Sequence, residues 1–390
     1  MAFPYSCPHQ ARVPPYKRDA VVGVDRINAE AVKSRSKEWR TVLDVADRVG
    51  TIGEEHYEFK RDALQNQTGS FGSVTIAELV GTGVEFAIKQ IDLRGTTNAA
   101  AQTKDDQKED ALVEKRAFYE EEVLNGIGGH PFCIELYDSF FSPRGPYLNL
   151  VLHKAEEDLN GYLARKGHLP EPTARFYAAE LLLALEHVHK KGFVWRDLKL
   201  ENVLIKADGH IAICDFDLAL PNPAIHSSAE AEQERQREEH SSSKGPHIFG
   251  TMDYLSPEVI QGGGHTEMSD FWAYGVLVYE IVYGARPFAA WSQERTFYNI
   301  TTRTLETPNK PEVSQVARSF ITQLLRKAGY PKVDPKKRLG GEGGAEAIKL
   351  HPFFEGIDFD TLHEQDALKY YKLPSAREAE GEKAFRNGSA

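Results

Sequence analysis

Cysteine is scarce in this sequence, with three residues (Cys7, Cys133 and Cys214) among 390. Their number is odd and their spacing matches no metal-binding motif, which excludes a disulfide scaffold and indicates a reducing compartment. Long hydrophobic runs are also missing. The longest, 271–285, contains a glutamate and is too short to span a bilayer. The first ten residues carry prolines and polar groups in place of an apolar segment, so we expect no secretory signal and an intracellular location, cytoplasmic, nuclear or both.

Basic residues are outnumbered by acidic ones, 47 against 58, for a formal net charge of −11. An acidic surface opposes nonspecific binding to nucleic acids and anionic membranes and favours basic partners. The hydrophobic fraction of 41% is ordinary, and the chain is long enough for one large domain or two lobes with a substantial core. We therefore predict no nucleic-acid partner and no membrane insertion.

The loop from Trp195 to Asn202 (WRDLKLEN), between an apolar helical run and a short apolar strand, is the most informative stretch. Asp197 can accept or orient a hydroxyl proton, Lys199 can steady a moving phosphoryl group, and Asn202 can ligate a metal ion. The alternative, a solvated polar turn, does not account for the motifs that accompany the loop in order. The loop resembles the catalytic loop of protein kinases, with Trp195 where that family usually has His or Tyr.

The resemblance covers roughly residues 57–360 and is closest to the AGC group of Ser/Thr kinases. It implies an α+β, bilobal protein-kinase-like fold. Residues 57–155 would form a small lobe, a five-stranded antiparallel β-sheet with one main helix, and 156–354 a larger, mostly helical lobe. Residues 1–56 would be an N-terminal extension, and 355–390 a short AGC-like tail in which we find no F-x-x-F motif.

A glycine-containing run from Gln67 to Val74 follows the pattern G-x-G-x-x-G-x-V, except that Gln67 replaces the first glycine. Glycines let backbone amides approach phosphate oxygens. Taken alone, the run indicates a tight hairpin. The strand that follows it ends in Lys89 and resembles the V-A-I-K strand of kinases, which favours a phosphate-binding loop instead. The resemblance implies that Lys89 contacts the phosphates and pairs with Glu114. The full set of implied nucleotide-binding residues is Gly69, Ser70, Phe71, Gly72, Val74, Ala87, Lys89, Glu114, Leu152, Asp158 and Leu204.

Asp215 follows an apolar strand and stands where kinases have the metal-binding aspartate of D-F-G. The resemblance implies that Asn202 and Asp215 hold Mg²⁺ on ATP. Asp217 replaces the glycine of that motif, and aspartate is among the few residues that tolerate the left-handed backbone expected there. Further along the activation segment, 226–244 has no apolar anchors and predicts a disordered insert.

Hydrophobic periodicity predicts several other elements. We expect an inserted loop over 96–110, strands over 130–136 and 147–152, and helices over 111–124, 159–165, 171–189 and 269–282. The segment 30–49 has rough helical spacing, and two readings stay open: a helix packed on the catalytic unit or a partly ordered extension. Asp270 stands at the start of the helix expected over 269–282, where an aspartate can cap the helix and also bond the backbone of the catalytic loop. The resemblance further implies that Arg338 pairs with Glu258.

His247 stands where AGC kinases carry a phosphorylatable threonine. Arg196 therefore either binds a phosphate on Ser241, Ser242 or Ser243, or belongs to a loop that needs no phosphate.

The implied activity is transfer of the γ-phosphoryl group of ATP to Ser or Thr of a protein by a monomeric enzyme, with Asp197 and Lys199 catalytic. Lys199 and Thr251 favour Ser/Thr over Tyr acceptors. Glu201 and Glu280 correspond to AGC acids that bind arginine upstream of the acceptor, which implies basic substrates. The alternative is a pseudokinase, a scaffold or allosteric binding module with little catalysis. Four departures from the family pattern favour it: Gln67, Trp195, Asp217 and His247.

Overall fold

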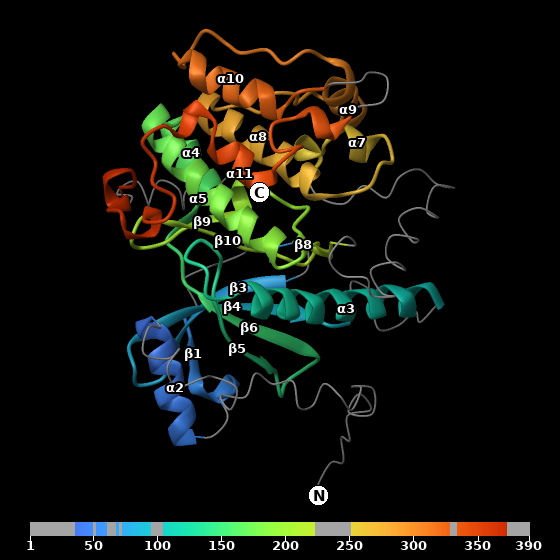
Figure 1. Cartoon of the computed structure of the whole chain (residues 1–390). Coiled ribbons are helices and arrows are strands. Elements are labelled where there is room, and N and C mark those ends of the chain that lie inside the picture. Colours follow the sequence, from blue (N-terminus) through green and yellow to red (C-terminus); the bar gives the residue numbers. More distant parts are fainter. Residues whose placement is uncertain are drawn as a thin grey trace, which may run out of the picture. The chain divides into compact units, whose positions relative to one another are not determined.

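The computed structural model describes residues 36–49, 52–60, 68–69, 72–94, 104–222, 251–327 and 334–372, with the backbone alone for 68–69 and 104–112. The chain divides into two compact units (Figure 1). The smaller comprises Met1–Glu121 and Glu135–Lys154, and the larger comprises Glu122–Ile134 and Ala155–Ala390.

The small unit is built on an antiparallel sheet with strand order β1-β3-β4-β6-β5, and the two-residue β2 also pairs with β3. Burial in β4 alternates along its first five residues, as expected for a strand with one face in the core. The antiparallel small-lobe sheet is therefore confirmed, with six strands among the described residues where five were expected. The strands are β1 (Tyr57–Phe59), β2 (Thr68–Gly69), β3 (Gly72–Leu79), β4 (Val84–Asp92), β5 (Leu136–Phe141) and β6 (Tyr147–His153).

Two boundary predictions in the small unit were wrong. The strand expected over 130–136 begins at Leu136 and continues to Phe141. Residues 131–132 form a turn at Pro131, which has no amide hydrogen for a ladder, and Cys133 makes an isolated parallel bridge with Ile213. The helix α3 runs from Lys104 to Ile127, so it begins inside the segment expected to be a loop. Its first turns lack an apolar face but contain good helix formers, which periodicity alone does not detect.

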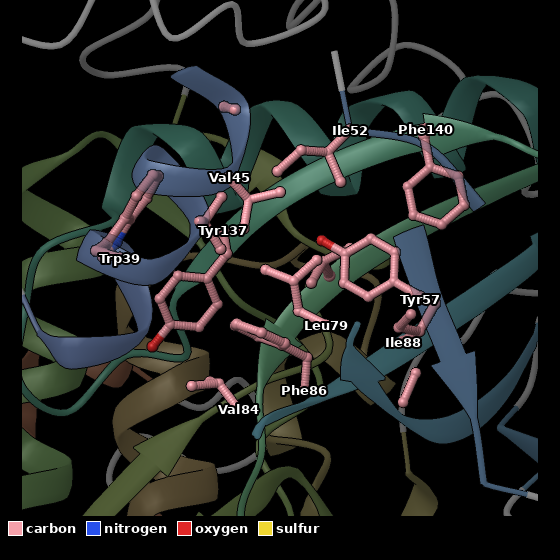
Figure 2. Packing of buried hydrophobic residues seen from close by; sticks show 14 of the residues in the cluster. Trp39, Val45, Ile52, Tyr57, Leu79, Val84, Phe86, Ile88, Tyr137 and Phe140 are labelled. Carbon is pink, nitrogen blue, oxygen red and sulfur yellow. The ribbon is translucent and has the colours of Figure 1, made fainter. Parts of the chain in front are cut away.

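The helix α2 (Lys37–Val49) packs on the small-unit sheet, which resolves the open question about this segment (Figure 2). The Trp39 indole Nε1 donates a hydrogen bond of 2.7 Å to Glu135 Oε1, and its ring meets the Tyr137 ring edge-on at 5.4 Å. The Tyr137 hydroxyl in turn lies 3.1 Å from His153 Nδ1 at the end of β6. The shared core contains Trp39, Val42, Leu43, Val45, Ala46, Ile52, Tyr57, Ala77, Leu79, Val84, Phe86, Ile88, Tyr137, Phe140 and Val151.

The large unit is mostly helical, as predicted, and two buried helices, α5 and α8, pack together at its centre (Figure 1). Thr266 caps α8 and forms a capping box with Ser269, so the predicted cap at Asp270 was wrong; Asp270 lies in the first turn. The helices are α4 (Leu159–Lys166), α5 (Glu171–Lys190), α7 (Pro257–Ile260), α8 (Glu267–Tyr283), α9 (Gln293–Thr302), α10 (Gln315–Leu324) and α11 (Gly344–Lys349).

Short strands of the large unit hold the loops that carry the polar motifs. Strands β10 (Ile211–Ile213), β9 (Val203–Ile205) and β7 (Glu157–Asp158) form one antiparallel sheet, and β11 (Leu220–Pro221) pairs with β8 (Phe193–Val194). Short 3₁₀ turns lie at η5 (Leu200–Asn202) and η7 (Met252–Tyr254). Among the helices that the structure describes, none combines the length and hydrophobicity of a membrane span.

Candidate active site

Asp197, in the loop between β8 and η5, is 5% exposed and has partners on both carboxylate oxygens. Oδ2 accepts hydrogen bonds from Lys199 Nζ at 2.7 Å and Asn202 Nδ2 at 3.0 Å. Oδ1 accepts from the Thr251 amide at 3.2 Å and the Thr251 hydroxyl at 3.3 Å. The structure thus brings together three residues predicted from one loop and adds a fourth from a motif 54 positions away.

Burial raises the pKa of Asp197, while Lys199 and the Asn202 amide oppose that shift and the Asp215 carboxylate adds to it. Burial alone would lower the pKa of Lys199, but the charges of Asp197, Asp215 and Glu201 raise it above its ordinary value. Lys199 therefore stays protonated beside an aspartate that binds a proton more readily than an exposed one.

The backbone of this loop is held by Asp270 in α8, as predicted. Asp270 Oδ2 accepts from the Trp195 amide and Oδ1 from the Arg196 amide, each at 2.9 Å. His189 Nε2 lies 2.8 Å from the same Oδ2. Arg196 has a φ of 71°, a conformation that costs a non-glycine residue free energy and persists where surrounding contacts enforce it. The hydrogen bonds from the Trp195 and Arg196 backbone amides to the Asp270 carboxylate are such contacts.

Trp195 connects the loop to the predicted metal ligand. Its indole Nε1 donates a 2.9 Å hydrogen bond to the backbone oxygen of Asp215, and its fully buried ring lies 5.5 Å from that of Phe216. Asp215 has a φ of 65°. The prediction of a left-handed backbone at Asp217 was therefore wrong. The left-handed residue is Asp215, whose carbonyl accepts the hydrogen bond from Trp195, and Asp217 is a buried turn residue.

The predicted metal ligands, Asn202 and Asp215, lie at adjacent strand ends. Val203 pairs with Ile213 in the β9–β10 register, and the next residue, Cys214, donates its amide to the Asn202 carbonyl at 3.0 Å. The Asn202 side-chain nitrogen is bound to Asp197, which directs the amide nitrogen there and leaves Oδ1 as the atom suited to a cation. One amide oxygen and one carboxylate fit Mg²⁺, which takes few protein ligands and completes its shell with water and phosphate oxygens.

Two predicted nucleotide-binding residues, Asp158 and Leu204, are cross-strand neighbours in the β7–β9 pair. Leu204 is half-buried. Asp158 is the N-cap of α4, and its Oδ1 accepts from the Gly161 amide at 2.7 Å. Asp158 thus has a structural role in addition to the nucleotide contact that the resemblance implies.

Four predicted residues of the small unit share one face of its sheet. Val74 pairs with Lys89 across β3 and β4, and Ala87 pairs with Leu152 across β4 and β6. Positions 87 and 89 are two apart and so point to the same face. Lys89 and Leu150 are also paired across β4 and β6, which extends this face along β6.

Lys89 binds Glu120, so the predicted pairing with Glu114 is wrong. The Lys89 ammonium group lies 2.6 and 2.8 Å from the Glu120 carboxylate oxygens, and Glu120 is 2% exposed. Glu114 precedes Glu120 by six residues, which is about 9 Å along the axis and about 240° around it. The two carboxylates therefore leave α3 in different directions, and Glu114 is half-buried elsewhere on the helix.

The glycine run is described in part. Gly69 pairs with Gly72 where β2 meets β3, as a hairpin requires. A Cβ atom on Gly72 would lie 2.4 Å from the Gln90 backbone oxygen, so the close approach of β4 requires glycine at this position. Ser70 and Phe71 lie outside the described residues, as do Gln67, the insert at 226–244, Ser241 to Ser243 and His247.

A buried ion pair joins Arg338 and Glu258 in the large unit, as the resemblance implied. Arg338 NH1 donates to Glu258 Oε1 at 2.7 Å, and NH2 contacts Oε2. The guanidinium also lies 4.8 Å from the centre of the Trp272 ring. Removing one partner of such a pair leaves a buried charge uncompensated.

Sequence reasoning missed Glu120 and the contacts of Thr251 with Asp197. The segment 114–122 contains four glutamates, and nothing in its local pattern distinguishes the one that faces β4. Thr251 was associated with the Ser/Thr acceptor, but its two hydrogen bonds to Asp197 follow from long-range folding.

Comparison of the sequence with known proteins identifies a matching family and several similar proteins. A family model described as "Protein kinase domain" matches residues 67–354. The serine/threonine-protein kinase KIPK1 of Arabidopsis thaliana is 30% identical over 83% of this chain and 39% of that protein. Phototropin-1A of Oryza sativa subsp. japonica is 34% identical over 83% and 34%, and flippase kinase 1 of Saccharomyces cerevisiae is 36% identical over 65% and 28%. The chain spans about two fifths or less of the length of these relatives.

Proposed function

Because the chain belongs to the protein kinase family and resembles AGC-type Ser/Thr kinases, we propose that it transfers the γ-phosphoryl group of ATP to serine or threonine hydroxyls of proteins. The observation that carries the proposal is the Asp197 carboxylate, held between Lys199, Asn202 and Thr251. A carboxylate fixed in this way can orient an alcohol, and the adjacent ammonium can offset charge on a transferring phosphoryl group.

In this reaction the acceptor oxygen forms a bond to the γ-phosphorus, the bond from that phosphorus to the β–γ bridging oxygen breaks, and ADP leaves. The hydroxyl proton passes to Asp197. We assign it to Oδ1, because the contacts of that oxygen with Thr251 are longer than those of Oδ2 with Lys199 and Asn202. Lys199 stays charged throughout and stabilises the transferring group.

Magnesium, bound with ATP, would neutralise the phosphate oxygens. Asn202 and Asp215 supply the oxygen donors for it, and the contact of Trp195 with the Asp215 carbonyl orients the second donor. In the small unit, Lys89 is the cation for the nucleotide phosphates, oriented by Glu120. Every position that phosphoryl transfer uses carries a suitable side chain, which favours an enzyme over a catalytically silent scaffold.

We also propose a protein substrate with a basic residue near the acceptor. Glu201 lies within the catalytic loop and is exposed, and the overall charge of −11 favours a basic partner.

The test compares the wild-type chain with Asp197→Asn, which keeps the side-chain size and removes the charge. Phosphate incorporation into a Ser/Thr peptide library, measured by mass spectrometry with ATP and Mg²⁺, is expected to fall about 10²- to 10⁴-fold. The matched control is Asp360→Asn, an exposed aspartate of the same unit, which is expected to retain full incorporation. Equal incorporation by the wild type and Asp197→Asn, or none above background in the wild type, would refute the proposal.

A further inference from the structure

Arg286, just beyond the end of α8, contacts two acidic side chains of its own unit. Its Nε donates to Glu280 Oε1 at 3.2 Å, and NH1 contacts Asp253 Oδ2. The side chain of Arg286 is 35% exposed. One guanidinium therefore bridges a carboxylate of α8 and a carboxylate of η7.

The carboxylate of Glu280 is engaged on both oxygens. Oε2 accepts from the Tyr254 hydroxyl, Oε1 accepts from Arg286, and the residue is 7% exposed. An arginine arriving from outside would meet a carboxylate that already has a cationic partner. It would have to displace Arg286 to bind there in a bidentate manner.

A third acid, Glu201, lies close enough to act on this group. Its charge raises the pKa of Tyr254 and of Glu280, in each case after the larger effect of burial. Three carboxylates and one guanidinium thus give a local charge of about −2. Unlike Glu280, Glu201 is exposed.

We propose that Arg286 is a built-in occupant of the arginine subsite at Glu280 and Asp253, so that a pair of upstream arginines in a substrate adds little to its binding. The inference rests on the proposed function, because it concerns the substrate of that site. The physical reason is competition: a tethered group has an effective concentration in the millimolar range or above, which a substrate arginine at micromolar concentration does not match.

The test measures binding separately from catalysis. Fluorescence anisotropy gives the Kd of the full chain for labelled peptides in which alanine replaces the acceptor serine, one neutral and one with arginines two and three residues upstream. The variants are Arg286→Ala, Arg286→Gln, Arg303→Ala and the double variant Arg286→Ala/Glu280→Gln. Arg303→Ala removes an equal charge from a more exposed ion pair with Glu306 in the same unit. Arg286→Gln keeps most of the side chain and serves if Arg286→Ala does not fold.

In the wild type we expect the two-arginine peptide to bind less than about threefold more tightly than the neutral one. In Arg286→Ala or Arg286→Gln the ratio of the two Kd values should rise to about tenfold or more, because Glu280 becomes accessible. A tenfold ratio corresponds to about 1.4 kcal/mol of binding free energy. The double variant should return to the wild-type ratio, and Arg303→Ala should match the wild type.

An unchanged ratio of Kd values in both Arg286 variants, or a tenfold preference of the wild type for the two-arginine peptide, would overturn the inference. Phosphotransfer to the serine versions of the peptides is measured in parallel. A changed binding ratio without phosphotransfer would count against the proposed function alone, and phosphotransfer with an unchanged ratio would count against the role of Arg286 alone.

Discussion

The Lys89 ammonium group contacts both carboxylate oxygens of Glu120, at 2.6 and 2.8 Å. The lysine comes from β4 and the glutamate from α3, so the ion pair links the sheet of the small unit to its helix. The Glu120 carboxylate is 2% exposed, and the Lys89 side chain is 12% exposed. A pair this buried has a fixed geometry and depends on both partners being present.

Glu120→Ala should therefore impair the nucleotide step, whereas Glu114→Ala should not. Without its partner, Lys89 loses its orientation, and we expect kcat/KM for ATP to fall about 10²-fold, or roughly 2.7 kcal/mol. Steady-state kinetics with varied ATP measures the effect. Since both variants remove one carboxylate from the same helix, Glu114→Ala controls for charge. An equal loss in both, or a larger loss in Glu114→Ala, would contradict the pairing.

Trp195 should act through its N–H group. Trp195→Phe removes the donor to the Asp215 carbonyl and should lower kcat about tenfold, the value of one lost buried hydrogen bond, with a raised Mg²⁺ requirement. Trp195→His restores a ring N–H and should retain more activity. The measurement is kcat of Trp195→Phe and Trp195→His at varied Mg²⁺ concentration. If Trp195→Phe and Trp195→His lose activity equally with no change in Mg²⁺ dependence, the ring contributes packing alone.

The helix α2 should be required for the stability of the small unit. Trp39→Ala removes a buried indole, its contact with Tyr137 and its bond to Glu135, and should lower the free energy of unfolding by about 3–5 kcal/mol. Urea denaturation followed by circular dichroism measures this loss. Arg40→Ala, exposed on the same helix, should change stability by less than about 0.5 kcal/mol. If Trp39→Ala leaves the free energy of unfolding unchanged, the helix α2 is not required for the stability of the small unit.

Stability of the small unit should depend on pH through Asp138. Burial raises the pKa of Asp138 to about 7, the Ser139 amide opposes the shift, and Glu121 adds to it; the Tyr57 hydroxyl is also close. Between about pH 4 and pH 7 the folded chain holds a proton that the unfolded chain has released. Stability contributed by this group is therefore fully present at low pH and is lost as pH rises toward 7.

Asp138→Asn removes the titration and should stabilise the chain at pH 8 relative to the wild type, by on the order of 2 kcal/mol. The measurement is Tm from pH 5 to pH 8 for both proteins. The difference in Tm should be small at pH 5 and grow with pH. A difference that is constant across this range would rule out titration of Asp138 as its cause.

The local motifs could be read from the sequence. Asp197, Lys199 and Asn202 lie within six residues of one another, so their short separation along the chain keeps them close in space. The alternation of β4 and the apolar faces of α5 and α8 likewise depend on the periods of strand and helix. For these reasons the antiparallel sheet, the helices α5 and α8, and the proximity of Asp197, Lys199 and Asn202 were predicted correctly.

Contacts between distant segments depended on tertiary structure. Which glutamate of α3 meets Lys89 is set by the rotation of that helix against β4, and a helix with many glutamates carries no local mark of that rotation. The approach of Thr251 to Asp197 and of Arg286 to Glu280 likewise follows from packing across tens of residues or around a helix end. Sequence by itself determined which chemical groups the protein has and in what order; the packing of helices on strands determined which of them are partners, because hydrogen bonds and ion pairs form across distances that local periodicity does not encode.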